Sequence, residues 1–139
     1  MNHLWAVLRG VVGGFGGYAA MGGLITLVQE NWLGGVSYHT SSLTVLAVGG
    51  FFAFLSAVAG GFIASLIAPH RPAWVGIAMC ALAVAETTWL IRAGRTDGPL
   101  WFDVAAAGSL LAGMMLGACW RSLVACCRRS AVGVARPIG

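Results

Sequence analysis

The sequence is short of charged residues and contains no lysine. Of its 139 residues only 9% are charged, whereas 59% are hydrophobic, and the mean hydropathy is +0.87. A soluble domain normally carries about 25% charged residues, because water must wet its surface. This composition excludes a soluble domain and predicts that lipid surrounds most of the chain.

Residue patterns for catalysis and metal binding are also lacking. The four cysteines show no C-x-x-C spacing and lie in or beside apolar runs, so neither a disulfide framework nor a zinc site is expected. We find no nucleophile beside a base, no phosphate-binding loop and no pair of carboxylates. The net charge of +4 comes from arginines between apolar segments, which disfavours nucleic acid as a partner. The sequence therefore predicts a protein without enzymatic activity, metal or cofactor.

Four apolar runs are each long enough to cross a membrane. A bilayer core about 30 Å thick needs roughly 20 apolar residues in a helix. A cleaved signal peptide is the rival interpretation of the first run, but glycines interrupt its apolar character, so we favour a retained helix. We expect membrane helices at about residues 4–28, 42–68, 73–91 and 100–124, followed by a short, basic, disordered tail over 125–139.

The boundaries of these runs carry helix signals, and the connections are short. Ser42 can cap the second helix, Pro69 stops it, and Pro72 suits the first turn of the third. The polar residues after Val28 should end the first helix. No connection can house a further domain. The sequence thus predicts an all-α fold with one domain over 1–139, a four-transmembrane-helix bundle of up-down-up-down topology with short loops.

The arginines are distributed unevenly between the two sides of such a bundle. Cytoplasmic segments of membrane proteins are enriched in basic residues, so the side with more arginines is predicted to be cytoplasmic. That side carries both termini, and the composition is typical of a bacterium. We therefore expect a multi-pass protein of the bacterial cytoplasmic (inner) membrane. The inner set is Arg9, Arg71, Arg121, Arg128, Arg129 and Arg136, against Arg92 and Arg95 outside.

Small residues recur at a spacing of four in three of the expected helices. In lipid, close approach of helix backbones matters more than burial of apolar side chains, so such ridges predict tight helix contacts. The ridges could pack within one bundle or hold a homo-oligomer together, and their number favours the first use for most of them. The residues expected to pack are Gly13 and Gly17 in the first helix, Gly49, Ala53, Ala57 and Gly61 in the second, and Gly113 and Gly117 in the fourth.

Glu86 is the candidate functional residue, because it lies about 20 Å into the third helix. An acid at the centre of a span costs about 2.5–3.5 kcal/mol on insertion scales, so we expect neighbouring helices to bury it. One interpretation is a proton or cation site that faces a cavity. The other is a packing acid, held by the Trp89 indole or by an arginine of a neighbouring helix.

Three short motifs carry a resemblance to known proteins. They are GGFIA at 60–64, IAPHRP at 67–72 and GPLW at 98–101. Together they resemble a loose group of small, uncharacterised four-helix bacterial integral membrane proteins, whose second helix ends in a glycine-alanine run and an Ala-Pro-x-Arg-Pro turn. The resemblance covers roughly residues 45–121, and it implies a fold and a compartment but no activity.

We therefore expect an integral inner-membrane protein with a structural role or an interaction role. Its expected partners are the lipid bilayer and either further copies of itself or another membrane protein. The alternative is a small homo-oligomeric transporter or channel, with Glu86 as its intramembrane proton or cation site. The two differ in one feature, because a transporter needs a water-accessible cavity that contains Glu86.

Overall fold

A computed structural model describes residues 3–35, 39, 41–68, 72–95 and 99–134, and the helical elements account for almost all of them. By length and composition, each of the four long helices could cross a membrane. The all-α fold predicted from the sequence is confirmed, and the chain is a multi-pass membrane protein. The elements are α1 (His3–Thr26) with a π-helical continuation η1 (Leu27–Trp32), α2 (Leu43–Ile67), α3 (Pro72–Arg92) and α4 (Leu100–Val134).

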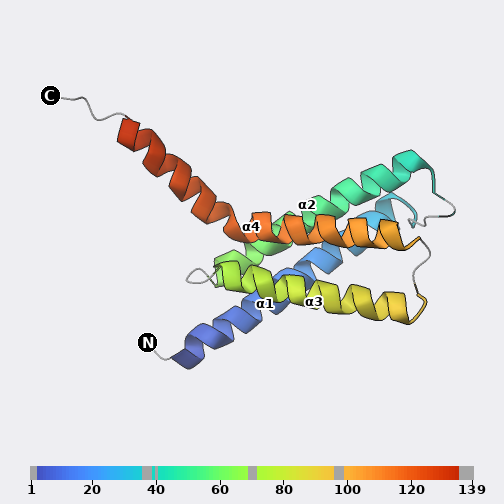
Figure 1. The fold of residues 1–139 in the computed structure, drawn as a ribbon, viewed down its shortest axis with the longest axis horizontal. Helices are drawn as coiled ribbons and strands as arrows, with labels where there is room; N and C mark the ends of the chain where they lie inside the picture. Colours follow the sequence, from blue (N-terminus) through green and yellow to red (C-terminus); the bar gives the residue numbers. More distant parts are fainter. Residues whose placement is uncertain (1–2, 36–38, 40, 69–71, 96–98, 135–139) are drawn as a thin grey trace.

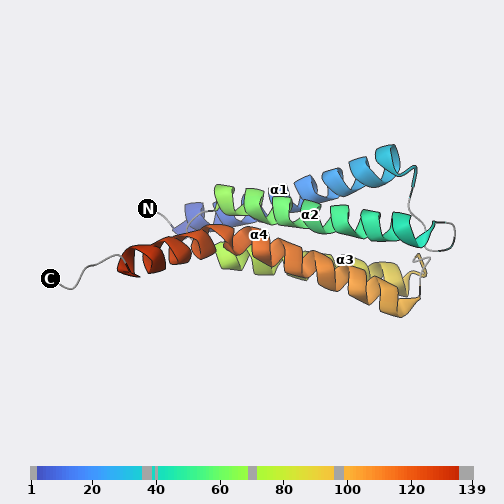
Figure 2. The ribbon, with the colours of Figure 1, turned by 90° about the horizontal axis from the view of Figure 1, so that it is seen from above.

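The helices form two layers. Figure 2 shows α1 and α2 in one layer and α3 and α4 in the other, with successive helices running in opposite directions. Helix α2 packs closely against both α1 and α4, whereas α1 and α3 make a smaller contact. The start of α1 and the end of α4 lie at the same end of the bundle (Figure 1). The most extensive packing therefore surrounds α2, and the α1–α3 side is the more open one.

Two of the expected helix starts are present as predicted. The Oγ atom of Ser42 accepts a hydrogen bond from the backbone N–H of Val45 at 3.4 Å, which satisfies one of the free donors at the start of α2. Helix α3 begins at Pro72. A backbone N–H in the first turn has no hydrogen-bond partner within the helix, so proline, which lacks this group, loses no hydrogen bond there.

The first helix continues further than the sequence suggested. We expected it to end near residue 28, at a polar cluster, but the helical path runs on through η1 to Trp32. Polar side chains can point into the headgroup region without breaking a helix, whereas glycine in the left-handed region does break it. Gly34 and Gly35 have φ angles of +66° and +88°, and the Gly35 N–H donates to the Gln29 carbonyl oxygen at 2.8 Å.

The last helix also corrects a prediction. A disordered tail was expected from residue 125 onward, yet α4 continues to Val134. Residues 119–132 contain neither glycine nor proline, so no helix breaker stands between the membrane span and that end. Figure 1 shows that the C-terminal part of α4 turns away from the bundle.

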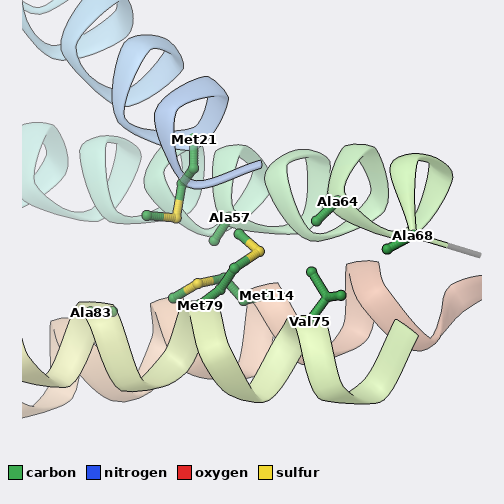
Figure 3. Close-up of a cluster of buried hydrophobic side chains, with 8 residues drawn as sticks. All are labelled: Met21, Ala57, Ala64, Ala68, Val75, Met79, Ala83 and Met114. Carbon is green, nitrogen blue, oxygen red and sulfur yellow. The ribbon is translucent and has the colours of Figure 1, made fainter. Parts of the chain in front are cut away.

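A small hydrophobic core lies between the layers. Met79 of α3 and Met114 of α4 have fully buried side chains and face each other below Ala57 of α2 (Figure 3). Around them lie short side chains, so the core is thin and the helix backbones come close together. The buried hydrophobic cluster consists of Met21, Ala57, Ala64, Ala68, Val75, Met79, Ala83 and Met114.

Candidate functional site

The contact between α1 and α2 is made by glycine backbones. A Cβ atom placed on Gly17 would lie 2.6 Å from the Gly60 carbonyl oxygen and 2.7 Å from the Ala64 Cβ. One turn earlier, a Cβ on Gly13 would lie 3.1 Å from the Ala64 carbonyl oxygen. Real Cβ atoms do not approach other heavy atoms at the distances found for Gly17, so any side chain there would separate the two helices.

The contact between α2 and α4 is closer still. A Cβ on Gly61 would overlap the Met114 carbonyl oxygen, and one on Gly117 would overlap the Val58 carbonyl oxygen. A Cβ on Gly113 would lie 2.9 Å from the Ala57 Cβ. Helix α2 therefore presents small residues to two partners at once, α1 on one face and α4 on another.

The structure places the small-residue ridges inside the bundle. Glycines with open space in front of them, where another chain could approach, fall elsewhere and include Gly22, Gly50 and Gly108. Of the residues that the sequence marked for packing, Ala53 is partly buried and the rest are buried: Gly13, Gly17, Gly49, Ala57, Gly61, Gly113 and Gly117.

Glu86 lies on the exposed surface of α3, and it is not buried by its neighbours as the sequence suggested. Its partner is Tyr18 of α1, whose hydroxyl donates a hydrogen bond to the Glu86 Oε2 atom. Among the side chains that the structure describes, neither of the expected partners, the Trp89 indole or an arginine, holds the carboxyl group. Trp89 instead lies beneath the Arg95 guanidinium, 5.6 Å from ring centroid to Cζ.

Position along α3, and not rotation around it, explains why Glu86 is exposed. Val75, Met79 and Ala83 of α3 follow one another at a spacing of four and point into the core. Glu86 comes seven residues after Met79, so its side chain points within about 20° of the same direction. Ala83 is the last buried residue of α3, and Glu86 therefore lies beyond the end of the core, where its carboxyl group meets Tyr18 of α1.

An open groove runs between α1 and α3 near this pair. Its volume is about 390 Å³, and its lining is almost entirely apolar. Leu82 lines the groove one turn before Glu86 on α3, and Gly14 lines it one turn before Tyr18 on α1. The Tyr18–Glu86 pair therefore lies one helical turn beyond the groove, which we call the α1–α3 groove. It is lined by Gly10, Val11, Gly14, Phe15, Ala78, Ala81 and Leu82.

The other polar side chains in the described part of the chain do not gather into a second site. Asp103 lies half-buried in the first turn of α4, where the helix dipole favours a negative charge, and its Oδ2 atom is buried without a partner among the described residues. The Cys80 Sγ atom contacts the Leu111 carbonyl oxygen at 3.8 Å, as a small packing residue between α3 and α4. Within the described residues, no three His, Cys, Asp or Glu side chains lie close enough to hold a metal ion.

Tyr18 is the residue that sequence reasoning missed. A signal was available, because the chain has two tyrosines and Tyr18 is the one inside an apolar run. It also lies at a depth comparable to that of Glu86, since α1 and α3 run in the same direction. What the sequence could not supply was the rotation of the two helices, which decides whether the side chains meet.

The α1–α3 groove and the Tyr18–Glu86 pair define what this surface can do chemically. An apolar groove with a carboxyl group one helical turn away suits an apolar molecule with a cationic or hydrogen-bonding end. No family model, curated protein or solved structure matches the chain.

Proposed function

We propose that this chain is a bacterial inner-membrane protein with a structural or interaction role, and that it is not an enzyme. The observation that carries the proposal is the backbone contact of α2 with both α1 and α4, through Gly60 and Gly61. Transport by alternating access requires one part of a bundle to move against another. Helices whose backbones touch along two faces of α2 leave little room for such a movement.

The lipid-facing surface supports an interaction role. Many of the large apolar side chains are exposed, as expected where lipid is the solvent. The Tyr18–Glu86 pair interrupts this surface within a membrane-spanning region. Polar groups at such a depth raise the free energy of insertion into the bilayer, and they mark functional surfaces. We infer that another membrane component engages the protein at this pair.

The alternative function is a small homo-oligomeric transporter or channel. It is favoured by one observation, the exposure of Glu86, because a second copy packed on the α1–α3 side could enclose the carboxyl group. Against it stands the lining of the α1–α3 groove, which is apolar and does not include Glu86. Water and ions do not enter such an apolar groove readily.

Replacing Glu86 by glutamine separates these two functions. Glutamine keeps the shape and can still accept a hydrogen bond from Tyr18, so the stability of the bundle should change by less than about 1 kcal/mol. We expect neither the native protein nor Glu86→Gln to move protons across liposomes at any pH between about 5 and 8. Proton flux through the native protein that disappears in a stably folded Glu86→Gln variant would replace the proposed function by the alternative.

The orientation of the helices is the second part of the proposal, with both termini in the cytoplasm. The six tryptophans agree with a membrane frame, because all are exposed (Trp5, Trp32, Trp74, Trp89, Trp101 and Trp120) and most lie near helix ends, where aromatic rings meet the headgroups. The ends of the bundle differ in arginine content, which gives the direction.

Reporter fusions test this orientation. We expect fusions after Val124 and within 69–72 to report the cytoplasm, and fusions at residues 37 and 96 to report the opposite side, because basic residues resist translocation. Activity of an externally active reporter at Val124 would reverse the assignment.

A further inference from the structure

We propose that the α1–α3 groove and Glu86 together bind a lipophilic cation, an amphiphile with one apolar chain and an amine or quaternary ammonium head. This inference rests on the proposed interaction role, and it names the chemistry of the molecule that engages the Tyr18–Glu86 pair.

Charge is the first reason. Within the described residues the partner of the Glu86 carboxyl group is a hydroxyl, which donates a hydrogen bond but carries no positive charge. The arginines whose side chains are described lie near helix ends, at Arg9, Arg92 and Arg95. A carboxylate in a medium of low dielectric constant attracts a cation strongly. The chain supplies the negative partner, and the ligand would supply the positive one.

Size and shape are the second reason. A volume of about 390 Å³ lies within the usual range of small-molecule pockets, roughly 300–1,000 Å³. The groove is open along one side, so a molecule dissolved in the bilayer can enter without passing through water. Its lining includes residues with small side chains, such as Gly14 and Ala81, which leave room for an extended chain.

Depth in the membrane is the third reason, because it matches the orientation of an amphiphile in one leaflet. Glu86 lies six residues before Arg92, the last residue of α3, or about 9 Å along the helix. The groove residues 78–82 lie about 6–12 Å further from that end. The charged end of the site is thus nearer to one membrane surface, and the apolar part extends toward the centre of the bilayer.

Two aromatic side chains contribute to recognition of the head. The Tyr18 hydroxyl donates a hydrogen bond to the Oε2 atom of Glu86 and holds the carboxyl group one helical turn from the groove. Phe15, one turn before Tyr18, lines the groove and is 62% exposed. An ammonium group near an aromatic face gains a cation–π attraction that a neutral head lacks.

Saturable binding of tritiated dodecyltrimethylammonium to the full chain in nanodiscs of neutral phospholipid tests the proposal, with empty nanodiscs as background. We expect Glu86→Gln to weaken binding at least tenfold, because it removes the charge. We expect Ala81→Trp to weaken it at least tenfold as well, because the ring fills the groove. Ala112→Trp, the same substitution at an exposed position of α4 outside the groove, should change the affinity less than twofold.

Competitors define the chemistry and the source of the ligand. Dodecyl sulfate, with the same chain and the opposite charge, should not displace the probe. Displacement by a cationic two-chain lipid would identify a lipid headgroup as the natural ligand, whereas failure to displace would identify a free amphiphile. Thermal unfolding of each variant verifies that it is folded.

Any of four results would overturn the proposal. They are no saturable binding to the native protein, an unchanged affinity in Glu86→Gln, an unchanged affinity in Ala81→Trp, or equal competition by dodecyl sulfate. A native protein that binds no probe but forms a dimer that Ala81→Trp dissociates would show that a second copy covers the groove. That result would contradict the proposed ligand but not the proposed interaction role. Proton flux through Glu86 would contradict the interaction role itself.

Discussion

Replacing Gly61 by alanine is expected to destabilise the bundle by about 1–3 kcal/mol, although alanine favours helix formation over glycine by up to about 1 kcal/mol. A methyl group at this position would overlap the Met114 carbonyl oxygen. Backbone atoms cannot rotate away as a flexible side chain can, so α2 and α4 must separate along their whole contact. The same reasoning applies to Gly117→Ala, whose Cβ would overlap the Val58 carbonyl oxygen.

Two glycines of the same helices provide matched controls. Gly50 in α2 and Gly108 in α4 have no heavy atom within 4 Å of an added Cβ. Gly50→Ala and Gly108→Ala should therefore leave stability unchanged or raise it by up to about 1 kcal/mol. Reversible unfolding in mixed detergent micelles measures all four variants. If Gly61→Ala and Gly50→Ala unfold at the same detergent ratio, the α2–α4 contact is not made through these backbones.

Shortening Met79 to alanine is expected to cost about 2–5 kcal/mol, the range for large buried side chains cut to alanine. Met79 is fully buried in α3 and lies against Met114 of α4, among short residues that cannot move into the space it leaves (Figure 3). In lipid the loss is mainly one of van der Waals contact, because removal from water contributes little.

Leu116→Ala is the matched control, since Leu116 is 45% exposed on α4 and should lose less than about 1 kcal/mol. The two methionines belong to the same buried cluster, so the double variant with Met114→Ala should cost less than the sum of the single variants. Equal effects of Met79→Ala and Leu116→Ala in the same unfolding assay would show that the layers do not meet at this core.

Hydropathy alone was sufficient to predict the four helices, because membrane spans must satisfy all their backbone hydrogen bonds within the helix. Ser42 and Pro72 allowed two helix starts to be predicted, because the first turn of a helix leaves backbone N–H groups without partners: Ser42 accepts from one, and Pro72 lacks one. Helix ends were harder. Polar residues at 29–31 and the basic segment after residue 125 looked like stops, yet both allow a helix to continue.

Two helical segments end at glycine. We expected polar residues to stop the first of them, and we assigned no stop signal to α3. Gly94, with a φ angle of +62°, completes the end of α3: its N–H donates to the Ile91 carbonyl oxygen, and the Arg95 N–H donates to the Leu90 carbonyl oxygen, each at 3.1 Å. This is the hydrogen-bond pattern of a glycine-terminated helix. In this chain, glycine shortly after an apolar run marks the end of a helix better than a polar cluster does.

The environment of Glu86 could not be predicted because it depends on helix rotation and on where the core ends along α3. Spacing along α3 indicates which residues share a face, but hydropathy does not tell which face meets the core when the whole helix is apolar. Val75, Met79 and Ala83 take the core face, and Glu86 shares this face but lies beyond the last buried residue, beside Tyr18. The small-residue ridges were more informative, since glycine marks close contact wherever the neighbour lies.

The accessibility of the α1–α3 side to lipid tests the functional interpretation most directly. Spin labels at Ala78 and Ala81, in a chain whose native cysteines are replaced by serine, report collisions with oxygen dissolved in the bilayer. Both positions are exposed, so we expect accessibility as high as at the exposed control Val84 and clearly higher than at the buried Ala83. Labels at Ala78 and Ala81 that are as shielded from oxygen as the label at Ala83 would contradict an open groove beside Glu86.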